Sequence, residues 1–179
     1  MDTYKLKFTQ VQQEVLRFLE VKAGERFTQR RIALSLGISP TAVSKALPLL
    51  VKEELVVVKK DPESKRLSIE FNSESSRAVW RKRAENLLML SESGLAGYLI
   101  GTFPGATIIL FGSYSRGDDT MRSDIDIALI GVEEKEADLS RFERILKRPI
   151  HLSFFPAVAE INRNLRANIY NGIVLDGSL

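Results

Sequence analysis

The sequence predicts an α+β chain of two domains. Three helical patterns followed by a β-hairpin pattern fill the first seventy residues, and two apolar strand patterns begin near residues 106 and 123. A long helical stretch separates these regions. We therefore expect domains over 1–72 and 104–179, joined by linking helices over 73–103.

The composition excludes several classes of protein. With no cysteine among 179 residues, disulfides and thiolate metal sites are excluded. The apolar stretches are far shorter than the ~20 residues of a membrane helix, and the N-terminus lacks the apolar core of a signal peptide. We therefore expect a cytoplasmic protein without a membrane partner. Residues 1–72 carry 13 Lys or Arg against 9 Asp or Glu, a basic excess compatible with a nucleic-acid partner.

Local signals place three helices in the first domain. Thr9, with a glutamine three residues later, forms a capping-box pattern before the first helix. The second helix begins near Thr28, and Gly37 can end it because glycine tolerates left-handed backbone. Ser39-Pro40 has the pattern of an N-cap and a first-turn proline before the third helix. Pro48 lies inside that helix and should bend or shorten it.

Polar and basic residues follow on the third helix and on a predicted hairpin. Opposite the apolar face of the helix lie Thr41, Ser44 and Lys45. LVVVKK and KRLSIEF then flank an Asp-Pro turn, a pattern typical of a β-hairpin. The tip of this hairpin is flanked by the basic residues Lys59, Lys60, Lys65 and Arg66.

Residues 8–71, with RRIALSLGISPTAVSKALPLL as their signature, resemble the winged helix-turn-helix family. The resemblance implies DNA binding, with the third helix in the major groove and the basic hairpin on phosphates. Helix-turn-helix proteins often bind palindromes as dimers, which favours a homodimer. The alternative is a winged helix used for protein contact, with Lys45 simply solvated.

The linking helix has a basic cluster of its own. We expect Ser73 to cap this helix, and Arg77, Arg81, Lys82 and Arg83 to form one face. A solvated face is the favoured interpretation of this cluster, and a nucleic-acid surface is the alternative.

The second domain contains the stretch GSYSRGDDTMRSDID. An apolar strand leads directly into Gly112-Ser113, where backbone amides can attract an anion. Residues two apart on a strand share a face, so Asp124 and Asp126 should project together. Two adjacent carboxylates repel, and Mg²⁺ relieves this while also binding substrate phosphates. The arrangement suits phosphoryl transfer from a nucleoside triphosphate.

GSYSRGDDTMRSDIDIAL resembles the signature of the nucleotidyltransferase superfamily that includes DNA polymerase β, and most closely the minimal nucleotidyltransferases. The resemblance covers about 104–179 and implies a small mixed sheet. It also implies that Gly112 and Ser113 hold the triphosphate, and that Asp124 and Asp126 are catalytic and bind Mg²⁺, or Mn²⁺ in its place. Accessory positions of the motif are matched by Arg116 and Ser123. For Arg116 the alternative is a surface ion pair with Asp118 or Asp119.

The resemblance fails at one position. Active members of the family usually bring a third carboxylate from a later strand, where RPIHLSFF places His151. His151 could replace it as the base, or bind a metal softer than magnesium, or mark a degenerate site. Asp176 is a possible substitute acid without support from the family.

Two functions remain open from the sequence. The leading hypothesis is a magnesium-dependent nucleotidyltransferase that moves a nucleoside monophosphate to a hydroxyl of a protein or nucleic acid. Because some minimal nucleotidyltransferases are antitoxins that transfer AMP to a toxin, a toxin is one possible acceptor. The alternative is a non-enzymatic transcriptional regulator or antitoxin-type repressor with a degenerate second domain.

Overall fold

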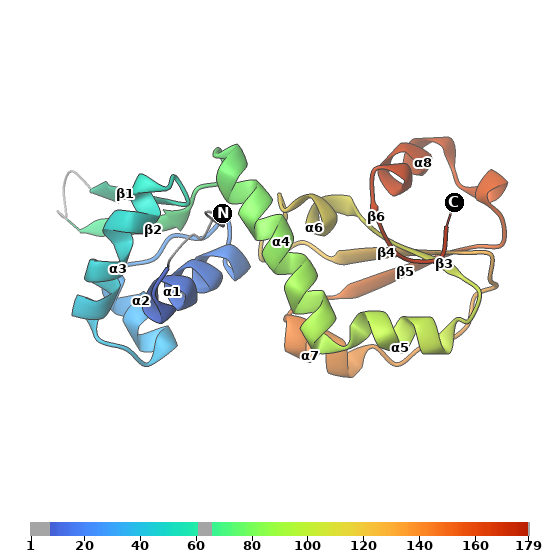
Figure 1. The fold of residues 1–179 in the computed structure, drawn as a ribbon, viewed down its shortest axis with the longest axis horizontal. Helices are drawn as coiled ribbons and strands as arrows, with labels where there is room; N and C mark the ends of the chain where they lie inside the picture. Colours follow the sequence, from blue (N-terminus) through green and yellow to red (C-terminus); the bar gives the residue numbers. More distant parts are fainter. Residues whose placement is uncertain (1–7, 61–65, 179) are drawn as a thin grey trace, which may run out of the picture. The chain divides into compact units, whose positions relative to one another are not determined.

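The computed structural model describes residues 8–60 and 66–178, which belong to two units, Met1–Val79 and Trp80–Leu179 (Figure 1). The chain has an α+β fold. The first unit contains three helices and a two-stranded antiparallel sheet, and the second contains a four-stranded mixed sheet with helices around it.

The helices of the first unit begin and end where local signals predict. They are α1 (Gln10–Val21), α2 (Gln29–Leu36) and α3 (Pro40–Lys52). Thr9 and Gln12 form a complete capping box, and Gly37 ends α2 at φ +67°. The Ser39 hydroxyl accepts from the amide of Ala42 at 3.1 Å. Helix α3 passes through Pro48 and ends four residues later.

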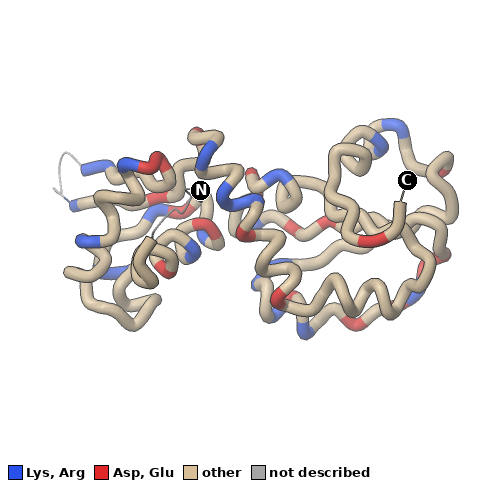
Figure 2. Tube along the Cα trace, in the orientation of Figure 1, with Lys and Arg blue, Asp and Glu red and all other residues tan. Residues whose placement is uncertain are grey.

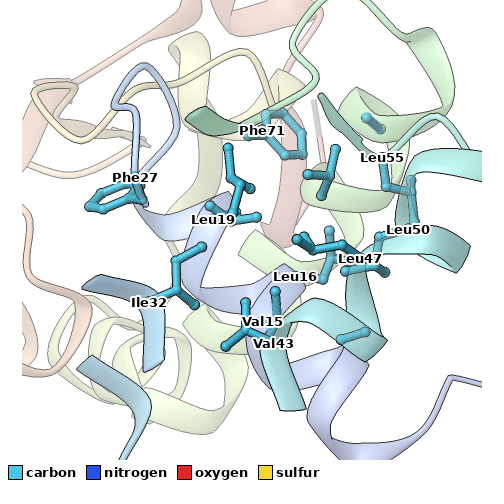
Figure 3. Close-up of a cluster of buried hydrophobic side chains, with 14 of the residues drawn as sticks. Val15, Leu16, Leu19, Phe27, Ile32, Val43, Leu47, Leu50, Leu55 and Phe71 are labelled. Atoms are coloured by element: carbon cyan, nitrogen blue, oxygen red, sulfur yellow. The ribbon is translucent and has the colours of Figure 1, made fainter. Parts of the chain in front are cut away.

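The hairpin consists of β1 (Val56–Lys60) and β2 (Leu67–Phe71), with Val58 opposite Ile69. Its tip, including Lys65, lies outside the described residues. Helices and hairpin share one apolar core, part of which Figure 3 shows, with Leu16, Val43 and Leu50 fully buried. Val43 and Leu50 of α3 point into this core, and the polar residues Thr41, Ser44 and Lys45 are exposed on the same helix.

The linking region forms α4 (Ser76–Ser93) and α5 (Leu95–Thr102), separated by Gly94 at φ +80°. The prediction that Ser73 caps this helix is wrong, because α4 begins three residues later and the Ser75 hydroxyl accepts a hydrogen bond from the amide of Ala78. The solvated interpretation of the basic cluster is wrong for Lys82, whose side chain is 1% exposed. The buried face of α4 is largely polar.

The sheet of the second unit has the strand order β5-β4-β3-β6. Its strands are β3 (Thr107–Phe111), β4 (Ile125–Ile130), β5 (Ile150–Phe155) and β6 (Ile173–Asp176). β4 runs parallel to β5, and β3 is antiparallel to both β4 and β6. The remaining helices are α6 (Gly112–Arg116), α7 (Ser140–Leu146), the 3-10 turn η1 (Val158–Glu160) and α8 (Arg163–Tyr170).

Each face of this sheet has its own apolar cluster. One cluster joins Ile108, Ile127 and Leu129 to residues of α5 and α7, including Leu99 and Phe142. The other joins the alternate strand residues, among them Phe111, Ala128 and Ile130, to Ile169 of α8. Because side chains alternate along a strand, Asp124 and Asp126 belong to the second of these faces.

Among the described residues, no single helix is long and apolar enough to cross a membrane, although α2 and α3 meet that criterion as a bent pair. Helices α2 and α3 contribute Ile32, Val43 and Leu50 to the core of the first unit, which accounts for their apolar composition.

Candidate nucleotide site and DNA-facing surface

The two aspartates lie beside each other at the start of β4. Asp126 is opposite Phe111, the last residue of β3, and opposite His151 on β5. The Nε2 atom of His151 is 3.9 Å from Oδ2 of Asp124. The structure therefore brings Asp124, Asp126 and His151 together, with the histidine side chain 70% exposed and that of Asp124 42% exposed.

Gly112 touches this group of side chains. It follows β3 directly and has φ +74°, a left-handed conformation that L side chains rarely adopt. A Cβ atom at this position would collide with Oδ2 of Asp126 and would lie 3.1 Å from its carboxyl carbon. The absence of a side chain at Gly112 thus lets the start of α6 approach the carboxylate.

Electrostatic repulsion within the pair is visible at Asp126. Partial burial raises the pKa of the Asp126 carboxyl above its ordinary value, and the neighbouring charge of Asp124 raises it further. His151 and Arg116 act in the opposite direction without cancelling the rise. A cation between the carboxylates would relieve this repulsion.

The donor set fits a hard divalent cation. Carboxylate oxygens are the ligands that Mg²⁺ prefers, usually from one or two carboxylates together with substrate phosphates. Among residues 8–60 and 66–178, no group of three or more His, Cys, Asp or Glu is arranged to hold a metal ion by itself. Asp124 and Asp126 are therefore two carboxylates at this site that could hold such an ion together with ligands from a bound molecule.

The other motif residues make local contacts. Nε of Arg116 lies 3.1 Å from Oδ2 of Asp118, so the exposed ion pair weighed from the sequence is present. The Ser123 hydroxyl accepts from the amide of Thr120 at 2.9 Å, closing the turn before Asp124. Ser113 is half-buried in the first turn of α6.

Asp176 does not reach this group of side chains. Along β3 it lies opposite Ile108, whereas Asp126 lies opposite Phe111, three residues further on. At about 3.3 Å per residue the two carboxylates are separated by roughly 10 Å along the strand direction. The prediction that Asp176 could replace the third carboxylate is therefore wrong.

A buried charge cluster behind the site was missed by sequence reasoning. Asp119, with a fully buried side chain, pairs with Lys82 of α4 and with Arg148, whose Nη2 lies 2.8 Å from Oδ2. Asn86 donates to the same carboxylate at 2.8 Å and to the carbonyl of Tyr114 at 2.9 Å. Burial, followed by the charge of Asp119, raises the pKa of the Tyr114 phenol. Lys82, Asn86 and Arg148 are distant from Asp119 in sequence, so no local pattern connects them to it.

In the first unit, Thr41, Ser44 and Lys45 are exposed on α3. Lys60 and Arg66 are exposed on the hairpin, and Figure 2 shows Lys and Arg positions in blue on both of its strands. Nζ of Lys59 lies 3.0 Å from the carboxylate of Glu70, which also binds Arg26 at 3.0 Å. Although burial opposes it, the hydrogen bonds from Lys59 and Arg26 lower the pKa of Glu70.

The two units define a chain that joins a winged helix to an α+β domain with a paired-carboxylate site. Comparison with known families agrees, since residues 95–171 match the nucleotidyltransferase domain family and residues 6–67 match the MarR family. The chain thus contains a nucleotidyltransferase domain preceded by a MarR-type winged helix domain. No curated protein matches it.

Among solved structures, the chain is similar to an adhesin competence repressor from Streptococcus pyogenes, with 23% identity over 58% of this chain and 72% of that one, at a TM-score of 0.43. It is also similar to a ZitR variant from Lactococcus lactis, with 23% identity over 57% of this chain and 67% of that one, at a TM-score of 0.42. The protein in a MepR–DNA complex from S. aureus has 22% identity over 50% of this chain and 74% of that one, at a TM-score of 0.38. These scores are too low to bear on function.

Proposed function

We propose that this protein is a magnesium-dependent nucleotidyltransferase that moves a nucleoside monophosphate from a triphosphate to an acceptor hydroxyl. The observation that carries the proposal is the contact between Gly112 and the carboxylate of Asp126, which sets the Gly-Ser turn directly against the acidic pair. The family match over 95–171 supports it. Neither feature alone would suffice, because a fold hosts many functions.

In this proposal each residue has a defined task. Gly112 and Ser113 hold the triphosphate, with Arg116 and Ser123 beside it, and Asp124 and Asp126 hold Mg²⁺ or Mn²⁺. The metal would neutralise charge on the phosphates. The acceptor oxygen forms a bond to the α-phosphorus as the bond to pyrophosphate breaks. His151, exposed beside Asp124, receives the proton of the acceptor hydroxyl.

Transfer of label from an α-³²P nucleoside triphosphate tests the proposal. The full chain would be incubated with Mg²⁺ or Mn²⁺ and a panel of protein and nucleic-acid acceptors. Label should move with wild type and not with a variant carrying Asp124→Ala and Asp126→Ala. Asp138→Ala is the matched control, because this exposed carboxylate accepts a hydrogen bond from the amide of Ser140 at the start of α7. No transfer to any acceptor, or equal transfer by the double variant, would refute the proposal.

A second candidate function is a non-enzymatic regulator. The observation that favours it is His151, which takes the register position opposite Asp126 where the resemblance leads us to expect a third carboxylate. Such a protein would bind DNA and would show no transfer, whether or not it binds triphosphate. The absence of transfer therefore distinguishes this candidate from the enzyme, and thermal stabilisation by triphosphate and metal shows only whether the site still binds nucleotide.

We also propose that the first unit binds duplex DNA as a homodimer, through α3 and the hairpin. Support comes from the MarR family match and from the exposure of Thr41, Ser44 and Lys45. Combined Lys60→Ala and Arg66→Ala changes should weaken binding and flatten its salt dependence. The single change Lys59→Ala is compared with the single change Lys60→Ala and should cost less affinity, since Lys59 already pairs with Glu70. Equal affinity of all variants would favour a protein-contact role instead.

A further inference from the structure

The inference concerns the loop over 117–123, which connects α6 to the acidic pair. Asp119 lies in the middle of this loop, and its side chain is completely buried. Nζ of Lys82 binds the Asp119 carboxylate and lies 2.7 Å from its backbone carbonyl. One ammonium group thus contacts both the side chain and the main chain of the same loop residue. Lys82 itself is fixed by its position on α4, a helix of 18 residues.

Arg148 holds the other half of the loop. Its Nη2 pairs with Asp119, while its Nη1 donates to the carbonyl of Thr120 and, at 3.3 Å, to that of Ser123. Ser123 immediately precedes Asp124. The Arg148 side chain is 4% exposed, so water cannot readily substitute for these bonds. Arg148 also begins the segment that leads into β5 and His151.

We propose that Lys82, Asp119 and Arg148 are positioning residues for the acidic pair, fixing the loop so that Asp124 stands beside Asp126. This inference rests on the proposed nucleotidyltransferase function. Arg148 donates to the carbonyl of Ser123, so the influence of the cluster reaches Asp124 through the backbone. Groups that orient metal ligands in this way typically change metal affinity about 10–100-fold when replaced.

Two variants separate positioning from folding. Asp119→Asn keeps the size of the side chain and removes the charge that two buried cations share. Arg148→Lys keeps the pairing charge and loses the fork that reaches two loop carbonyls. The control is Asp138→Asn, the same chemical change at an exposed carboxylate of the same unit. If Asp119→Asn does not fold, the charge-conserving Arg148→Lys decides the question.

The measurement is Mn²⁺ affinity by electron paramagnetic resonance, on the full chain, with and without ATP. Affinities are compared per folded molecule, at a temperature well below unfolding. A purely structural role would lower the melting temperature and leave this affinity unchanged. Hydrogen exchange of the amides over 120–124 provides a second readout.

We expect Asp119→Asn and Arg148→Lys to weaken Mn²⁺ binding by about tenfold or more, and to speed exchange at 120–124. Asp138→Asn should change neither quantity. Wild-type affinity in folded Arg148→Lys and Asp119→Asn would overturn the positioning role and leave the proposed function standing. Failure of wild type itself to bind Mn²⁺ with ATP would overturn the proposed function and this inference together.

Discussion

Replacing Gly112 with alanine tests the close approach between α6 and Asp126. The change has two costs. A left-handed φ of +74° disfavours any L side chain by roughly 1–2 kcal/mol. The new Cβ would also collide with the Asp126 carboxylate, and relief of such overpacking typically costs about 1–3 kcal/mol. We therefore expect Gly112→Ala to lower the free energy of unfolding of the second unit by about 2–5 kcal/mol.

Gly105 provides a matched control. It has φ +84° in the same unit, but nothing lies within 4 Å of the Cβ that alanine would add. Gly105→Ala should therefore cost only about 1–2 kcal/mol, from the backbone conformation alone. The difference between the two variants isolates the contact with Asp126.

A double-mutant cycle with Asp126→Ala completes the test. In that background the collision with the carboxylate is absent and only the Cβ of residue 126 remains, at 3.3 Å, so the cost of Gly112→Ala should fall close to that of Gly105→Ala. Urea unfolding followed by hydrogen exchange of the amides of β3 and β4 reports on the second unit. The reasoning is refuted if Gly112→Ala and Gly105→Ala have equal effects, or if Asp126→Ala does not reduce the cost of Gly112→Ala.

Three further predictions concern charge. Lys82→Met leaves the buried Asp119 without one of its cations and should destabilise the second unit by about 3–5 kcal/mol in urea unfolding; a loss below about 1 kcal/mol, the value of a surface pair, would contradict this. The pKa of Asp126 in the folded protein is raised above its ordinary 3.8, so the stability of the wild type falls as pH rises from 3.8 through the raised pKa. Asp126→Asn should therefore be more stable than wild type at pH 7 and should lose this advantage in acid. Hydrogen bonds from Ser140 lower the pKa of Asp138, so the ionised carboxylate stabilises the fold above pH 3.8 and this stabilisation is lost as pH falls through the lowered pKa. Asp138→Asn should therefore be less stable than wild type at pH 7 and equal to it in acid. Unfolding curves at several pH values check both predictions. At pH 7 the Asp126→Asn change should raise the free energy of unfolding and the Asp138→Asn change should lower it.

Features that depend on neighbouring residues were predictable from the sequence. The caps at Thr9, Thr28 and Ser39 and the left-handed stop at Gly37 are local, so their residue types suffice. Strands β3 and β4 are apolar runs that could only lie inside a sheet. The fold class is confirmed by the structure, whereas the roles of the individual site residues stay predictions.

Features that depend on distant partners could not be predicted. Lys82 has the pattern of a solvated helix residue, and its burial depends on Asp119, 37 positions later in the chain. Apolar periodicity cannot reveal that the buried face of α4 is polar, because the partners of its polar residues are distant in the sequence. In α7, Ile145 is 48% exposed, while Leu146 is buried.

Helix α4 has a practical consequence for anyone dissecting the protein. Ala78, in its first turn, belongs to the apolar core of the first unit, and Leu90, near its end, belongs to that of the second. The division between Val79 and Trp80 therefore falls within a continuous helix rather than in a loop. Separately expressed fragments should overlap through this helix, because a truncation at the division would leave the first fragment with only residues 76–79 of the helix that carries Ala78.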